Sequence, residues 1–144
     1  MKTMFARSIL IGVSVVALLL APTAFAATET YTAELKGASE VPPNDSAGAG
    51  TLTATLDTST KELTYRVSFG GLSGPPTAAH FHGPAAANAN AGVVVLVKEL
   101  NPPIQGKATL TDAQIADLQG GKWYFNIHTE KNKGGELRGQ VVKK

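Results

Sequence analysis

The three histidines of this 144-residue chain lie in two short segments that have the pattern of β-strands. His80 and His82 are separated by one residue, so on a strand both imidazoles point to the same face. In the second segment apolar and polar side chains alternate, and His128 falls on the polar face. If the two strands are neighbours, the three imidazoles converge, and three imidazoles are a ligand set for one copper or zinc ion.

These histidines have two interpretations. Adjacent strands lie about 4.8 Å apart, and imidazole side chains can close such gaps onto an ion at about 2.0 Å. A metal held by three histidines keeps its fourth position open. The alternative is a structural cluster in which the imidazoles hydrogen-bond to loop carbonyls and hold no metal.

Three charged residues are candidates to support the histidines. Glu136 and Arg138 alternate onto one face of the last predicted strand, so pairing with the His128 strand would bring them near the imidazoles. Glu136 would then be a fourth ligand or an acceptor for a ligand histidine, and Arg138 would attract an anion. A cross-strand ion pair is the simpler explanation of both. Glu40 would be held at the site by the rigid Val41-Pro42-Pro43 segment, or would cap a loop.

The first 26 residues have the pattern of a secretory signal peptide. Lys2 and Arg7 make a basic start, residues 9–20 are apolar, and Ala24-Phe25-Ala26 is a small-x-small cleavage site. The apolar run is shorter than the span of about 20 residues that a transmembrane helix needs. We therefore expect cleavage after Ala26, a secreted or periplasmic location, and no membrane insertion of residues 27–144.

Charge and cysteine content narrow the class of partner. Two of the 13 Lys and Arg lie in the predicted signal peptide, and the others balance the 11 Asp and Glu. Nucleic acids and anionic membranes need a basic patch, so neither is an expected partner. The chain has no cysteine, so its stability must come from a hydrophobic core or a metal. The expected partner is an extracellular protein or a small ligand of unknown identity.

Residues 27–144 are predicted to form one domain. The segment 92–98 is apolar on both faces and is interpreted as a buried strand, whereas the other predicted strands alternate. The single helix begins at Thr111, which forms a capping box with Gln114, and Gly120-Gly121 ends it. The absence of βαβ alternation predicts an all-β antiparallel Greek-key sandwich or barrel of about eight strands with one short helix. The predicted strands are 30–35, 51–56, 61–69, 77–83, 92–98, 106–110, 122–129 and 135–142.

Four short motifs resemble, in their order along the chain, the CHRD domain family, which is named for its repeats in chordin. The motifs are Ala38-Ser39-Glu40-Val41-Pro42-Pro43, Thr77-Ala78-Ala79-His80-Phe81-His82-Gly83-Pro84, Asn126-Ile127-His128-Thr129 and Gly135-Glu136-Leu137-Arg138-Gly139-Gln140. The resemblance covers essentially all of residues 27–144 and implies an extracellular or periplasmic β-rich domain. It implies no reaction, and growth-factor binding does not carry over, because a bacterial-type secreted chain lacks that partner.

A second similarity is to the copper half of Cu,Zn superoxide dismutase. A His-x-His strand, a distant strand histidine and a C-terminal arginine resemble that site, which implies a copper redox enzyme as an alternative function. The chain lacks the bridging histidine, the zinc-loop ligands and the disulfide of that enzyme. Three hypotheses remain open, and we expect the first: a non-catalytic binding module with copper or zinc at His80, His82 and His128, a copper-dependent oxidoreductase, or a structural or adhesive module without metal.

Overall fold

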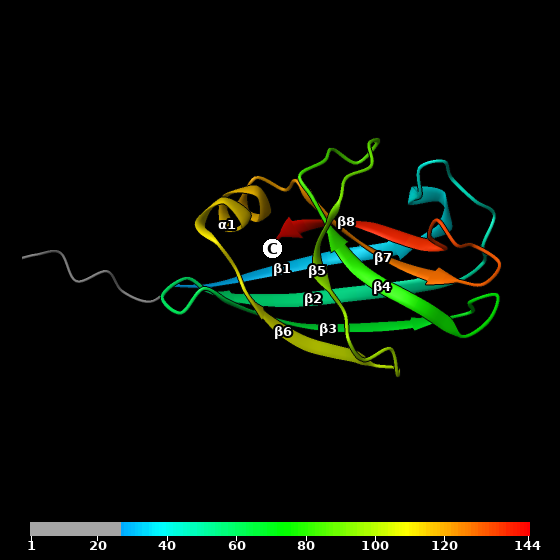
Figure 1. Ribbon diagram of the computed structural model, residues 1–144, viewed down its shortest axis with the longest axis horizontal. Helices are drawn as coiled ribbons and strands as arrows, with labels where there is room; N and C mark the ends of the chain where they lie inside the picture. Colours follow the sequence, from blue (N-terminus) through cyan, green and yellow to red (C-terminus); the bar gives the residue numbers. More distant parts are fainter. Residues whose placement is uncertain (1–26) are drawn as a thin grey trace, which may run out of the picture.

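The structure, a computed structural model, describes residues 27–144, and the predicted signal peptide lies outside the described residues. Eight antiparallel strands form one sheet in the order β5-β4-β7-β8-β1-β2-β3-β6, which curls into a nearly closed barrel (Figure 1). The all-β prediction with one short helix is therefore confirmed. The elements are β1 (Thr28–Lys36), η1 (Gly37–Ser39), β2 (Ala49–Asp57), β3 (Glu62–Gly70), β4 (Pro76–His82), β5 (Val93–Leu96), β6 (Ile104–Thr109), α1 (Asp112–Gln119), β7 (Trp123–Thr129) and β8 (Leu137–Lys143).

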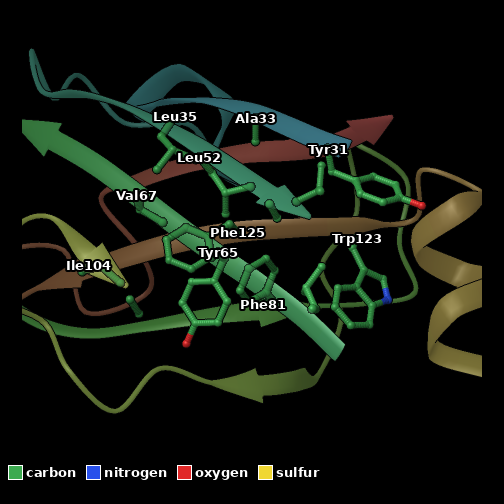
Figure 2. Packing of buried hydrophobic residues seen from close by; sticks show 14 of the residues in the cluster. Tyr31, Ala33, Leu35, Leu52, Tyr65, Val67, Phe81, Ile104, Trp123 and Phe125 are labelled. Carbon is green, nitrogen blue, oxygen red and sulfur yellow. The ribbon is translucent and has the colours of Figure 1, made fainter. Parts of the chain in front are cut away.

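The core consists of the inward-facing side chains of successive strands, with an aromatic group at its centre. The ring of Phe81 on β4 contacts Tyr65 on β3 and Phe125 on β7 edge to face, at centroid distances of 5.1 and 4.9 Å (Figure 2). Such pairs add to the free energy of burying the rings. Because side chains alternate across a strand, packing Phe81 and Phe125 inward turns their sequence neighbours His80, His82 and Asn126 outward.

The helix α1 closes one end of the barrel beside β8 (Figure 1). Its predicted capping box is present, because Thr111 Oγ1 accepts from the Gln114 N–H and Gln114 Oε1 accepts from the Thr111 N–H. Leu118 is its fully buried residue and anchors the helix to the core. Of the helices in residues 27–144, none is long and apolar enough to cross a bilayer.

The prediction of a buried strand at 92–98 is wrong. The strand there, β5, is shorter and lies at an edge of the sheet, where it pairs with β4. Val93 and Leu96 are 45% and 67% exposed. A continuous run of valines is apolar on both faces of a strand, whether the strand lies at the centre of a sheet or at its edge. Hydrophobic pattern alone therefore cannot distinguish an edge strand from a central one.

Replacing Phe81 with Ala is expected to lower the free energy of unfolding by about 3–5 kcal/mol, because the ring is fully buried at the aromatic centre. The measurement is urea unfolding followed by Trp123 fluorescence. Leu96→Ala is the control, since it removes an exposed apolar side chain and should change stability by less than about 0.5 kcal/mol. Equal losses in the two variants would contradict this description of the core.

Candidate metal centre

The candidate site lies on the outer face of the sheet, where β4, β7 and β8 are hydrogen-bonded neighbours. In the β4–β7 register His80 is opposite Asn126, and Ala78 is opposite His128. In the β7–β8 register Asn126 is opposite Arg138. The two strands that carry the histidines are therefore neighbours, which is the condition for the imidazoles to converge, and β8 lies next to β7.

The three imidazoles converge. One nitrogen from each of His80, His82 and His128 can be chosen so that all three lie within 4.8 Å of one another. His80 Nδ1 and His128 Nε2 are 3.2 Å apart. Nitrogens that bind one tetrahedral ion at about 2.0 Å lie about 3.3 Å apart, so small side-chain rotations would close the wider gaps. His82 is 9% exposed, and the other two imidazoles are half-buried.

Backbone carbonyls select the tautomers of two of the histidines. His82 Nδ1 donates to Ala91 O at 2.9 Å, and His128 Nδ1 donates to Lys133 O at 2.8 Å. A neutral imidazole carries one N–H, so Nε2 of both rings presents a lone pair to the centre of the site. A ring N–H donated to a backbone carbonyl is the usual arrangement behind a metal-binding histidine.

Burial favours the neutral form of His80 and of His82. Desolvation lowers the pKa of His80 and of His82 below its usual value, and the charge of His128 lowers both further. Neutral imidazole is the form that binds a metal ion.

Asn126, which sequence analysis did not single out, lies at the centre of the histidine group. Its Oδ1 is 2.9 Å from His82 Nε2 and 3.0 Å from His128 Nε2, and the residue is 3% exposed. Its place on the polar face two residues before His128 was a sequence signal. The sequence alone does not show that Asn126 belongs to the site, because this depends on the strand register, which sets Asn126 opposite His80.

A stack of three side chains forms one wall of the site. The guanidinium carbon of Arg138 lies 3.5 Å from the Tyr124 ring centroid. The other face of Tyr124 is parallel to the His82 ring at a centroid distance of 4.7 Å. Tyr124 is 3% exposed because it lies within this stack.

Arg138 anchors the 84–91 loop over the site. The arginine is 1% exposed, and its guanidinium donates to Asn90 Oδ1 at 2.8 Å and to Ala89 O at 2.6 Å. The same loop supplies Ala91 O, which accepts from His82. Arg138 was expected to attract an anion, but its N–H groups donate to the loop instead. Arg138 therefore supports the position of His82 indirectly, through the loop.

Glu40 lies behind Asn126, on the side away from the imidazoles. Its carboxyl group lies near the Asn126 amide, the residue is 6% exposed, and Oε1 is buried without a hydrogen-bond partner in residues 27–144. Burial raises the pKa of Glu40 to about 7, although Arg138 and Asn126 act in the opposite direction. Gly135 makes room for this pair, since a Cβ there would overlap the Glu40 carboxyl and lie 2.8 Å from Asn126 Nδ2.

Glu136 is fully buried, and its carboxylate bonds to loop residues. It accepts from Ser46 Oγ and from the Ser73 N–H, both at 2.8 Å, and from the hydroxyls of Ser73 and Thr129. Burial by itself raises the pKa of Glu136, but these hydrogen bonds outweigh it and hold the pKa at about 2. The structure therefore places Glu136 where it joins the loops before β2 and β4 to β7, outside the histidine group.

The low pKa of Glu136 predicts a contribution to stability that disappears in acid. Its ordinary value is 4.5, so the contribution is complete above pH 4.5 and is lost as the pH falls toward 2. Glu136→Gln should lower the free energy of unfolding at pH 7 by up to about 3 kcal/mol, and should reduce the difference between pH 7 and pH 3. Urea unfolding at both values measures this. Glu99→Gln, at an exposed position, is the control, and an unchanged pH dependence in Glu136→Gln would contradict the assignment.

Comparison with known proteins agrees with the motifs and the fold. The family model of the CHRD domain matches residues 31–141, a range that contains all three histidines and Asn126. No curated protein and no solved structure matches the chain. CHRD is an extracellular-type domain, which supports a secreted-type binding module. By this match, which spans most of the chain, the protein belongs to the CHRD domain family.

Proposed function

We propose that this protein is a secreted binding module that holds one copper or zinc ion at His80, His82 and His128. The observation that carries the proposal is the pair of backbone carbonyls that hold the Nδ1–H groups of His82 and His128. In the neutral rings both Nε2 atoms consequently carry lone pairs, and one nitrogen from each of the three histidines lies within 4.8 Å of the other two.

The chemistry of the donors supports copper or zinc over other cations. Imidazole is a ligand for zinc and copper, whereas calcium and magnesium are bound by sets of oxygen ligands. The three side chains that converge within the described residues are all histidines. The lowered pKa values of His80 and His82 reduce the competition of protons with the metal at these two ligands.

Export is part of the proposal. The signal-peptide pattern of residues 1–26, with cleavage after Ala26, agrees with the extracellular type of the CHRD domain. The module would then act in the periplasm or the medium, on an extracellular protein or small ligand of unknown identity. A chain without cysteine gains from a metal the kind of stabilisation that other exported domains obtain from disulfides.

A copper oxidoreductase has less support. The resemblance to superoxide dismutase relied on an arginine that attracts an anion to the metal. The guanidinium of Arg138 is instead covered by the 84–91 loop and Tyr124, with the residue 1% exposed. A role in binding therefore fits the site better than turnover.

The proposal predicts about one equivalent of copper or zinc in protein that is exported natively and purified without chelator or His-tag. Mass spectrometry measures the metal content, and titration of the metal-free protein measures the affinity. His80→Ala, His82→Ala and His128→Ala should each abolish stoichiometric binding, because two imidazoles hold a divalent ion weakly. Gln105→Ala, at an exposed position on β6, is the control and should bind normally.

Circular dichroism of the three variants establishes that the loss is local, since the histidines lie outside the core. Stoichiometric binding that persists in both His80→Ala and His128→Ala would overturn the proposal. So would a wild-type protein without metal and without affinity for added copper or zinc. The histidines would then be a hydrogen-bonded cluster in a structural or adhesive module.

A further inference from the structure

We infer that Asn126 Oδ1 is the fourth ligand of the metal ion, which makes the site a closed centre of three nitrogens and one oxygen. This inference rests on the proposed three-histidine site. It assigns a ligand to the fourth coordination position, which three histidines leave open. Whether that position is filled decides whether a substrate could bind to the ion.

The first argument is the position of the amide oxygen. Asn126 Oδ1 is 2.9 Å from His82 Nε2 and 3.0 Å from His128 Nε2. Each of these rings donates its Nδ1–H to a backbone carbonyl, so in the neutral ring Nε2 has no hydrogen to give to the amide oxygen. Acceptor atoms that meet without a hydrogen between them repel, and a cation bound by all of them removes the repulsion.

The second argument is the orientation of the amide. The NH₂ group of the Asn126 amide lies on the side of Glu40, since a Cβ on Gly135 would overlap the Glu40 carboxyl group and would also lie 2.8 Å from Asn126 Nδ2. With the NH₂ group on that side, Oδ1 is directed at the imidazoles, where it lies 2.9 Å from His82 Nε2 and 3.0 Å from His128 Nε2. Glu40 does not belong to the histidine group itself, so it is a positioning residue that acts through Asn126. Gly135, with φ of 128°, provides the space for both side chains.

A fourth protein ligand changes what the ion does. Structural zinc sites are closed by four protein ligands, whereas catalytic sites keep one position open. An amide oxygen is a hard donor that suits divalent copper or zinc, while cuprous copper prefers sulfur. The centre would join β4 to β7, and Ala91 and Lys133 would connect it to two loops. The ion therefore strengthens the fold at the binding face and does not turn over a substrate.

The experiment uses the full-length chain, exported and purified without a tag, and loaded with Zn²⁺ or with Cu²⁺. Asn126→Leu should weaken zinc binding on the order of 100-fold, because it removes a ligand at nearly constant volume. Asn126→Asp supplies a carboxylate oxygen instead and should bind within about tenfold of wild type. Gln140→Leu is the matched control, since its half-buried side chain on β8 donates through Nε2 to Ala85 O and Gly121 O and not to the histidines.

Electron paramagnetic resonance of the Cu²⁺ form separates a ligand from a structural amide. The wild-type spectrum should respond to added azide less than that of Asn126→Leu, because the amide oxygen already occupies the fourth position. Asn126→Leu should respond, and Asn126→Asp should show a changed copper hyperfine coupling, which keeps the proposal testable if the leucine variant does not fold. Unchanged spectra in Asn126→Asp, or equal azide responses in wild type and Asn126→Leu, would overturn the inference.

Glu40 is tested by the same measurements. Glu40→Ala should weaken zinc binding by about 10-fold and allow azide to bind, because the amide loses the group that orients it. Glu40→Gln should restore most of the affinity, since its amide oxygen still accepts from Asn126. Glu136→Gln removes another buried carboxylate outside the histidine group and should leave metal affinity unchanged. A Glu40→Ala variant with wild-type affinity and spectrum would overturn the positioning role.

The outcomes distinguish the two proposals. Wild-type protein that binds neither Zn²⁺ nor Cu²⁺ overturns the proposed function and the inference with it. Wild-type protein that binds one equivalent, with equal affinity and spectrum in Asn126→Leu, overturns the inference alone. The three histidines would then form a metal site with an open fourth position.

Discussion

The packing of Phe81 against Phe125 is the contact on which the candidate site depends. Both rings are fully buried at the centre of the barrel, on the two neighbouring strands that carry the histidines. Because the side chains of a strand alternate between its two faces, this contact also decides what points outward. His80, His82 and Asn126 are directed to the same outer region by the core beneath them, and the site needs no separate scaffold.

The outer face presents a different physical problem, since it buries charge. Arg138 and Glu136 are almost fully covered, and a buried charge is costly unless it is hydrogen-bonded. Arg138 meets this requirement with loop carbonyls and the Tyr124 ring, and Glu136 meets it with hydroxyls and an N–H. Each charge therefore holds loops in place. Through Arg138, the 84–91 loop is held where Ala91 O can set the tautomer of His82.

The contacts that stabilise the outer face of β4, β7 and β8 also orient the side chains that would bind the metal ion. The carbonyls of Ala91 and Lys133 orient two imidazoles, and Glu40 orients the amide between them. Every one of these contacts joins segments that are distant along the chain or belong to loops. A single ion at their centre would connect all of them, which is a substantial constraint for a CHRD domain without cysteine. Support of this kind behind a ligand set is what distinguishes a metal site from a chance group of histidines.

The sequence by itself determined the local directions of the side chains. Alternation on a strand placed His80 and His82 together and Phe81 opposite them, and the pairing of Thr111 with Gln114 located the helix, because both depend on backbone geometry over a few residues. Only the tertiary structure decided which distant segments meet. Strand register set Asn126 opposite His80, and strand order placed the valine-rich β5 at an exposed edge. Register and order follow from the packing of the whole barrel, which no short segment encodes.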